Sequence, residues 1–279
     1  MKKKQKAAVS LAIKEVIQML MDRVMNKVLK EDPFIPEKHR AEKPLYAALV
    51  PNEIFKGSHF ERRFVTPFGG VWEKLAMTLA KNILGKGEVS YMVNGNVKAE
   101  RLRRISEILN ELEHGGVEKK RQKPDWKSEI DYILKGNGEP IPVNVICDVY
   151  AEDTKNGKKY AFELKAPLPN SDQTKVSKEK IFKLLAMEPR IIDEAFYALP
   201  YNPYGKREYY AWSFPYRWFD MKNDPTVLIG DEFWDKLGGK GTYQMFIDEI
   251  NQLGKEYRLR IYREYLGIEP PENLDTNLL

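Results

Sequence analysis

One hairpin pattern, between residues 143 and 167, constrains the fold of this chain more than any other feature. The runs VNVICDVY and YAFELKAP are apolar and strand-like, and a polar stretch that contains Lys-Asn-Gly at residues 155–157 separates them. Asparagine and glycine tolerate the left-handed backbone of tight turns, so the pattern predicts two antiparallel strands. Side chains alternate along a strand, which places Glu163 and Lys165 together on one face. This pair indicates either a solvent-facing ion pair or a functional site.

The expected register adds a second carboxylate to that face. With the turn between Asp153 and Lys158, Asp148 lies opposite Glu163. Like charges across a ladder repel each other unless a cation lies between them, and carboxylate oxygens are ligands that Mg²⁺ prefers. Lys165, one pleat further along, can neutralise the charge that develops at phosphorus during hydrolysis. The hairpin therefore predicts the site of a metal-dependent phosphodiesterase.

These residues carry a family resemblance. Asp148, followed after a hairpin by Glu163 and Lys165, resembles the signature of the PD-(D/E)xK nuclease superfamily, in which the two acids hold the metal and the lysine serves the attacking water. The stretch from residue 123 to residue 181, above all the run ELKAPLPNSDQTK, resembles the TdeIII family of type II restriction endonucleases. The resemblance implies an α/β fold with a restriction-endonuclease-like core: a central mixed sheet with an antiparallel hairpin, flanked by helices.

The same resemblance implies an activity and its partners. The expected reaction is Mg²⁺-dependent hydrolysis of double-stranded DNA at a short palindromic site, GGNCC, which leaves 5′-phosphate and 3′-hydroxyl ends. Two-fold symmetric proteins meet palindromic sites, so a homodimer is expected. A cognate DNA methyltransferase that protects the host DNA is implied as well.

The sequence offers several alternative carboxylates as metal ligands. The literal Pro-Asp pair of the superfamily motif ends at Asp125, but Asp148 is favoured because the hairpin brings it beside Glu163. Asp131, in the strand-like run EIDYIL, is a weaker candidate. Glu179, near the start of a predicted helix, either supplies a further carboxylate or is an exposed helix residue.

Cations and amides after the second strand predict where DNA lies. The expected phosphate contacts are Lys175, Lys178, Lys180 and Lys183. The expected contacts to base edges, which the loop before the helix would present, are Asn170, Asp172 and Gln173. These three residues are equally suited to cap that helix. Arg207 and Arg217 are further candidates for contacts to phosphate or guanine. A second basic cluster either forms another track along DNA or is a solvated connection; it consists of Lys119, Lys120, Arg121 and Lys123.

Composition narrows the class of protein. The single cysteine, Cys147, excludes an internal disulfide and a multi-cysteine zinc site, which fits the cytoplasm. Charged residues interrupt every apolar run of the N-terminal stretch, so neither a signal peptide nor a membrane span is expected. The 46 Lys and Arg against 41 Asp and Glu give a net charge of +5, which favours a polyanionic partner only weakly.

The remaining patterns predict one nuclease domain over residues 1–279, with a helical N-terminal elaboration at 1–116, a catalytic β-rich core at 117–230 and C-terminal helices at 231–279. Helices are expected at 9–28, where an apolar stripe serves core packing or pairs with a second subunit, and at 69–84, 101–114, 177–187, 191–199 and 243–265. Further strands are expected as a hairpin around Asn94-Gly95 and at 129–134, 208–214 and 225–229. The proline-rich stretch 31–46 is expected to be irregular.

Two alternative functions compete with a restriction endonuclease. Another nuclease of the same superfamily, for repair or for junctions, would cut according to DNA structure rather than sequence. A DNA-binding module with an inactive nuclease fold would bind without cutting, but such a fold has no need to keep all three of Asp148, Glu163 and Lys165.

Overall fold

The computed structural model describes residues 3–115, 122–272 and 274, and its contacts divide the chain into two compact units. The sheet unit is Ala76–Tyr243, and the helical unit joins Lys2–Leu75 to Gln244–Leu279. This division does not test the assignment of all 279 residues to one nuclease domain, which stays a prediction.

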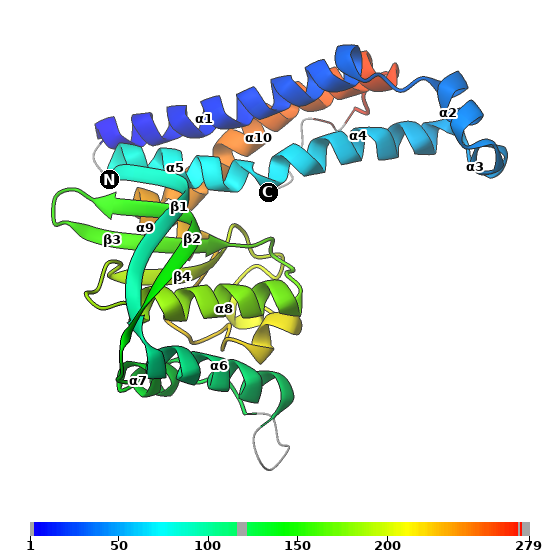
Figure 1. The fold of residues 1–279 in the computed structure, drawn as a ribbon. Helices are drawn as coiled ribbons and strands as arrows, with labels where there is room; N and C mark the ends of the chain where they lie inside the picture. The colour runs from blue at the N-terminus through cyan, green and yellow to red at the C-terminus, as the bar shows by residue number, and fades with distance from the viewer. Residues whose placement is uncertain (1–2, 116–121, 273, 275–279) are drawn as a thin grey trace. The chain divides into compact units, whose positions relative to one another are not determined.

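A five-stranded mixed sheet forms the centre of the sheet unit, with strand order β1-β2-β3-β4-β5 (Figure 1). The strands are β1 Gly85–Lys98, β2 Pro140–Asp153, β3 Lys158–Leu164, β4 Glu194–Leu199 and β5 Val227–Ile229. The pairs β1–β2 and β2–β3 are antiparallel, whereas β3–β4 and β4–β5 are parallel. The α/β class, with a mixed sheet that contains an antiparallel hairpin, is thereby confirmed.

The β2–β3 hairpin has the predicted register. Val149 pairs with Phe162 and Asp153 with Lys158, so Asp148 and Glu163 are the next positions along the ladder. The turn depends on Gly157, whose φ of +72° is left-handed, and on the Asp153 carboxylate, which accepts hydrogen bonds from the turn.

Helices cover both faces of the sheet. Helix α8, Ser171–Ala186, follows β3 and leads to β4, while α9, Asp231–Gly238, follows β5. Phe233 of α9 contacts the ring of Phe162, whereas Tyr197, which lies on the opposite face of the sheet, hydrogen-bonds Thr174 of α8. Glu163 pairs with Tyr197 in the β3–β4 ladder, so its side chain shares the face that α8 covers.

Two further helices pack beside α8, and one of them overturns a prediction. They are α6, Ala99–His114, which was predicted, and α7, Trp126–Leu134, where a strand was expected. The Asp125 carboxylate caps α7 by accepting a hydrogen bond from the Ser128 amide, 3.1 Å away. Glu129 and Ile133, four residues apart, are buried on one helical face, so the spacing in this run has the helical period.

Three other predictions in the sheet unit are wrong. The Asn94-Gly95 pair makes no turn, because β1 runs through it: a Cβ at Gly95 would lie 2.7 Å from the Met187 sulfur, so the glycine serves close packing. Residues 194–199 form β4 instead of a helix, since a strand buried on both faces lacks alternation. The expected strand at 208–214 is replaced by 3₁₀ turns at Arg207–Tyr209 and Phe214–Arg217.

The helical unit is built around the predicted N-terminal helix. Its helices are α1 Lys3–Asn26, extended by a π-helical turn Lys27–Glu31, α2 Pro36–Glu42, α3 Pro44–Leu49, α4 Asn52–Gly69, the start of α5 Val71–Ile83, and α10 Thr242–Arg260, extended by Ile261–Leu266. The apolar stripe of α1 is buried, and Tyr257 of α10 donates to the Asp22 carboxylate of α1 at 2.7 Å. No helix in the described ranges is long and apolar enough to cross a membrane.

The segment 31–46, expected to be irregular, contains α2 and the start of α3. Proline lacks an amide hydrogen and has a φ close to the helical value, so it suits the first turn of a helix. Pro36 and Pro44 occupy that position in α2 and α3. The prolines therefore begin helices in a stretch that was predicted to be irregular.

Candidate active site

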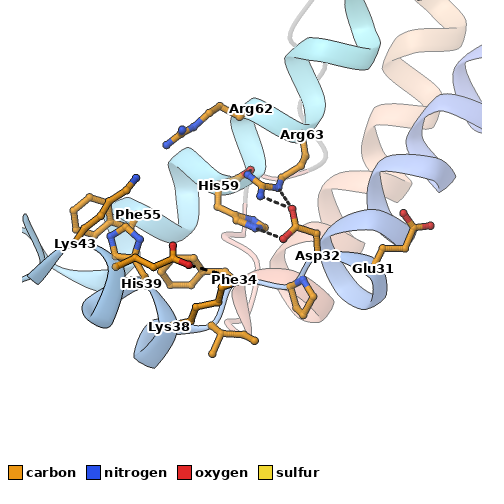
Figure 2. A pocket seen from close by; sticks show the side chains of 13 residues that line it. Glu31, Asp32, Phe34, Lys38, His39, Lys43, Phe55, His59, Arg62 and Arg63 are labelled. Carbon is orange, nitrogen blue, oxygen red and sulfur yellow. Dashed lines mark hydrogen bonds and ion pairs between the residues drawn. The ribbon is translucent and has the colours of Figure 1, made fainter.

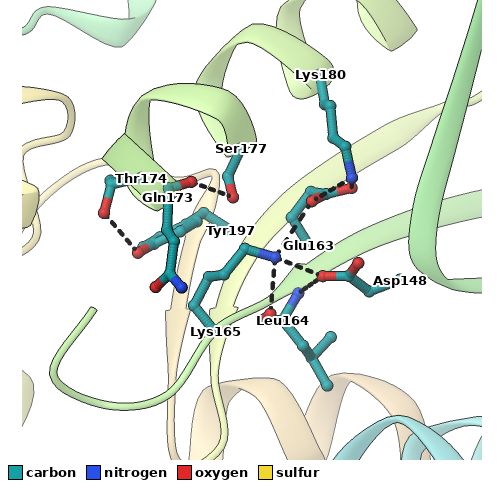
Figure 3. A network of polar contacts seen from close by, with 9 residues as sticks. All are labelled: Asp148, Glu163, Leu164, Lys165, Gln173, Thr174, Ser177, Lys180 and Tyr197. Carbon is teal, nitrogen blue, oxygen red and sulfur yellow. Dashed lines mark hydrogen bonds and ion pairs between the residues drawn. The ribbon is translucent and has the colours of Figure 1, made fainter. Parts of the chain in front are cut away.

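Three side chains meet where β2 and β3 lie side by side. Asp148 comes from β2, Glu163 is the second-last residue of β3, and Lys165 follows the strand directly. The Lys165 ammonium lies 2.7 Å from Asp148 Oδ2, 3.5 Å from Glu163 Oε2 and 2.9 Å from the Leu164 carbonyl oxygen (Figure 3). The structure thus brings together the three residues that the sequence analysis selected.

Backbone hydrogen bonds fix this geometry. The amide of Leu164 donates to Asp148 Oδ2 at 2.8 Å, so the carboxylate is held against the end of β3. The amide of Lys165 donates to the Ala198 carbonyl of β4 at 3.0 Å, which extends the ladder past the last residue of β3. The side chains of Glu163 and Lys165 therefore project from backbone that the sheet immobilises.

Glu163 is the most buried member of the group, with 1% of its surface exposed. Burial, and after it the nearby Asp148 carboxylate, raise the pKa of its carboxyl to about 7, although Lys165 and Lys180 oppose the change. The site therefore contains an acid whose charge depends on the cations placed around it.

Lys180 is the residue whose place the sequence analysis missed. It was expected among the phosphate contacts, but its ammonium lies 3.0 Å from both carboxylate oxygens of Glu163 (Figure 3). The signal for this contact exists only in three dimensions, because α8 must return across the face of the sheet from which Glu163 projects. With Lys165, it gives the buried carboxylate two cationic partners.

The donor set of this site fits a hard divalent cation. Three oxygens, from Asp148, Glu163 and the Leu164 carbonyl, surround the Lys165 ammonium, which stands where a cation is favoured. All three are hard ligands of the kind that Mg²⁺ takes. Among the described residues no three His, Cys, Asp or Glu side chains gather around one point. The Leu164 carbonyl adds a backbone oxygen to the two carboxylates at this place.

The alternative carboxylates have other partners. Asp125 is the cap of α7, and hydrogen bonds from Ser128 lower the pKa of its carboxyl. Asp131 lies on the exposed side of the same helix, and Glu179 pairs with Lys183 at 2.6 Å on α8. Asp148 is the aspartate that the described contacts join to Glu163 and Lys165.

Two of the expected DNA contacts are occupied within the fold. Lys178 is fully buried, pairs with Glu129 at 2.6 Å and donates to the Trp218 carbonyl, so its ammonium is not presented to DNA. Arg207 donates to Glu232 at 3.0 Å and to two carbonyl oxygens of residues 221 and 224, which ties the segment after β4 to α9. A residue count along α8 or along a loop cannot show such internal partners. The burial of Lys178 argues against its expected DNA contact, whereas Arg207 stays partly exposed.

The other expected DNA contacts are divided between capping and exposure. Asn170 caps α8 by accepting from the Gln173 amide at 2.8 Å, which is the alternative role foreseen for it. Asp172 and Gln173 are exposed in the first turn of α8, and Lys175 pairs with Glu113. Arg217 and Lys123 also reach the surface, while Lys119, Lys120 and Arg121 lie outside the described residues.

The loop between β3 and α8 has a rigid support. The Tyr210 hydroxyl donates to the Pro167 carbonyl and the Trp212 indole donates to the Pro169 carbonyl, each at 2.8 Å. The aromatic segment after β4 thus holds the loop that leads into α8, whose first turn contains the exposed residues 172 and 173.

A separate hollow of about 350 Å³ lies in the helical unit (Figure 2). Its polar centre is Asp32, which accepts from Arg63 Nε at 2.8 Å and lies 3.8 Å from His59 Nε2. The hydrogen bond from Arg63 lowers the pKa of the Asp32 carboxyl, and burial lowers the pKa of His59. The Asp32 carboxylate is therefore held in an ion pair with Arg63 within the helical unit.

Comparison with known proteins identifies the family. Residues 9–254 match the family model described as "Type II restriction endonuclease, HinfI". The type II restriction enzymes HgiCII and HgiEI of Herpetosiphon aurantiacus are 26% and 24% identical to this chain, over 80% and 87% of its length and 82% and 89% of theirs. The type II restriction enzyme MjaII of Methanocaldococcus jannaschii is 28% identical over 67% of this chain and 54% of its own. The chain belongs to the HinfI-type family of type II restriction endonucleases, which are site-specific DNA nucleases.

Proposed function

We propose that this chain hydrolyses both strands of DNA with Mg²⁺ through a PD-(D/E)xK site formed by Asp148, Glu163 and Lys165. One observation carries the proposal: three oxygens, from Asp148 on β2 and from Glu163 and Leu164 at the end of β3, converge on the Lys165 ammonium. That arrangement combines a cation site and a mobile positive charge, which are the two requirements of phosphodiester hydrolysis.

The protein's residues divide the work. Asp148, Glu163 and the Leu164 carbonyl would hold Mg²⁺, which supplies an activated water and positive charge at the scissile phosphate. The Lys165 ammonium, whose flexible stem leaves the rigid end of β3, stabilises the charge that develops on the phosphate oxygens. Lys180 favours the ionised form of Glu163 and so opposes the effect of burial on the pKa of this carboxyl.

The exposed polar residues beyond the site would contact DNA. The loop between β3 and α8 leads directly from Lys165 to Asp172 and Gln173, and its support by Tyr210 and Trp212 limits the freedom lost on binding. Lys175 and Arg217 are the proposed phosphate contacts, because both are partly exposed and both lie close enough to Glu113 to lower the pKa of its carboxyl. Base contact by Asp172 or Gln173 would supply sequence specificity.

Further parts of the proposal rest on the resemblance to the TdeIII family. They are recognition of GGNCC, products with 5′-phosphate and 3′-hydroxyl ends, a cognate DNA methyltransferase and a cytoplasmic location. A homodimer follows from the two-fold symmetry of such a site, since each of two antiparallel strands then meets an identical catalytic group.

Digestion of a sequenced plasmid with the purified protein, with Mg²⁺ and with EDTA, tests the proposal. Discrete Mg²⁺-dependent fragments that share one end sequence are expected, and mapping their ends reads the site directly. Fragments with no shared end sequence would instead favour a repair or junction nuclease with the same three residues. Binding without cutting under any divalent metal would overturn the catalytic assignment.

A further inference from the structure

An apolar surface at one end of the helical unit has no core of its own. We call residues 35–54 the α2–α3 tip; it comprises α2, α3 and the first turn of α4. None of α2, α3 and α4 has a buried side chain, yet Leu45 is 79% exposed and Leu49 is 82% exposed. The other exposed large apolar residues of the tip are Ile35, Tyr46 and Ile54.

This exposure is unusual for elements so short. Helices of seven and six residues are unstable alone in water, and in proteins the burial of an apolar face supplies most of their stability. Within the helical unit, α2 and α3 lie beyond the end of α1, at the N-terminal end of α4 (Figure 1). Contiguous exposed apolar surface of this kind marks an interaction site.

Aromatic ring contacts attach α2 of the tip to α4 and to Phe34. The ring of His39 in α2 lies 4.1 Å from that of Phe55 in α4 and 5.7 Å from that of Phe34 (Figure 2). These three rings line the hollow around Asp32, whereas Leu45 and Leu49 are not among its lining residues. Leu45 and Leu49 are four residues apart on α3, so their side chains form one continuous patch.

The charges around this patch indicate its partner. Residues 35–54 contain three acids, Glu37, Glu42 and Glu53, and three bases, Lys38, Arg40 and Lys43. A surface that binds DNA backbone presents mainly positive charge, and this balanced set does not. A two-fold interface places the same patch on both sides, which requires a surface that is compatible with itself. Balanced charge around an apolar centre meets that requirement.

We infer that the α2–α3 tip is the surface through which two copies of this chain associate, with Leu45 and Leu49 of both copies packed together. The inference rests on the proposed double-strand cleavage, because one chain contains one Asp148–Glu163–Lys165 site and two antiparallel strands require two. Association through the tip supplies the second site and buries the leucines.

Sedimentation velocity of the full-length chain without DNA tests this assignment. The wild type is expected to sediment as a dimer at micromolar concentration, and the Leu45→Glu/Leu49→Glu variant as a monomer. The matched control is Leu11→Glu/Met19→Glu, which places the same two charges on α1 residues that are 57% and 55% exposed. This control is expected to remain a dimer. Circular dichroism confirms that each variant is folded.

Three results would overturn the inference: a monomeric wild type, a tip variant that stays dimeric, or a control that dissociates. A monomeric wild type would assign the tip to a different protein partner. Plasmid cleavage separates this failure from failure of the proposed function. If the wild type dimerises through the tip but never cuts DNA, the function falls and the interface stands. If it cuts both strands and tip substitutions change neither cutting nor mass, the interface falls and the function stands.

Discussion

The proposed catalytic site of the sheet unit and the α2–α3 tip of the helical unit differ in whether their side chains have partners within the chain. At the proposed site, Glu163 is buried between two lysines and the Asp148 carboxylate accepts a hydrogen bond from a backbone amide. At the tip, Leu45 and Leu49 contact mostly solvent. The charged side chains of the first region have partners within the chain. The leucines of the second region are apolar like core residues but are not covered by other residues of the chain. Substitutions should therefore act through chemistry and folding in the first region, and through association in the second.

The largest effect is expected at Lys165. Replacing Lys165 by Ala removes positive charge from the transition state, so cleavage should fall by about 10³-fold or more while DNA affinity changes little. Single-turnover cleavage and a binding assay measure the two quantities. Lys155→Ala is the matched control, because it removes the same charge from the exposed turn of the same hairpin.

The choice of aspartate can be tested in the same assay. Asp148→Asn should abolish Mg²⁺-dependent cleavage, whereas Asp125→Asn alters only the cap of α7 and should keep it. Loss of cleavage in Asp125→Asn alone would show that the metal ligand is the aspartate of the literal Pro-Asp pair. For the preceding prediction, a cleavage rate of Lys165→Ala equal to that of the wild type would show that this lysine has no role in the reaction.

The next largest effect is expected on stability, at Lys178. Lys178→Met leaves the Glu129 carboxylate in the interior without its partner, so the free energy of unfolding should fall by about 3–5 kcal/mol in a urea titration. Lys183→Met is the control on the same helix: its pair with Glu179 is partly exposed, and the expected change is below about 1 kcal/mol. Equal stability of the two variants would contradict the assignment of Lys178 to the interior. Adding Glu129→Leu to Lys178→Met should recover part of the loss.

A smaller effect is expected from pH, through Glu163. The pKa of this carboxyl rises from 4.5 to about 7 on folding, so between these values the folded state retains a proton that the unfolded state has lost. Without divalent ions, the free energy of unfolding should therefore fall as pH rises through this window. The total is up to about 3 kcal/mol, since one pKa unit corresponds to about 1.4 kcal/mol. Urea unfolding at about pH 5 and about pH 7.5 measures it.

Glu163→Gln cannot ionise and should lose this pH dependence, while Glu179→Gln, a carboxylate on the surface of α8, should keep it. A wild-type profile that stays flat, or that rises with pH, would mean that the lysines hold Glu163 fully ionised. Either outcome shows how completely Lys165 and Lys180 offset the burial of this carboxyl.

The β2–β3 hairpin was predictable because its sequence signal is local. Gly157 and the alternation on either side set the turn and the register, and the register alone places Asp148 beside Glu163. Lys180 and Lys178 were not predictable, because their partners Glu163 and Glu129 come from other elements that only packing brings near. Asn94-Gly95 misled for a related reason: the same pair serves a hairpin turn or the close packing of a strand, and Met187 decides which.

The smallest effect on stability is expected at the α2–α3 tip. Measured at a concentration low enough for the wild type to be monomeric, Leu45→Glu/Leu49→Glu should change the free energy of unfolding by less than about 0.5 kcal/mol, because these side chains leave no buried contact behind. Ile13→Ala, in the buried stripe of α1, should cost about 2–5 kcal/mol in the same unit. At high concentration the wild type alone should gain stability over the tip variant, since association stabilises only the folded state. A large loss in the tip variant at low concentration would mean that these leucines already belong to the core of a single chain.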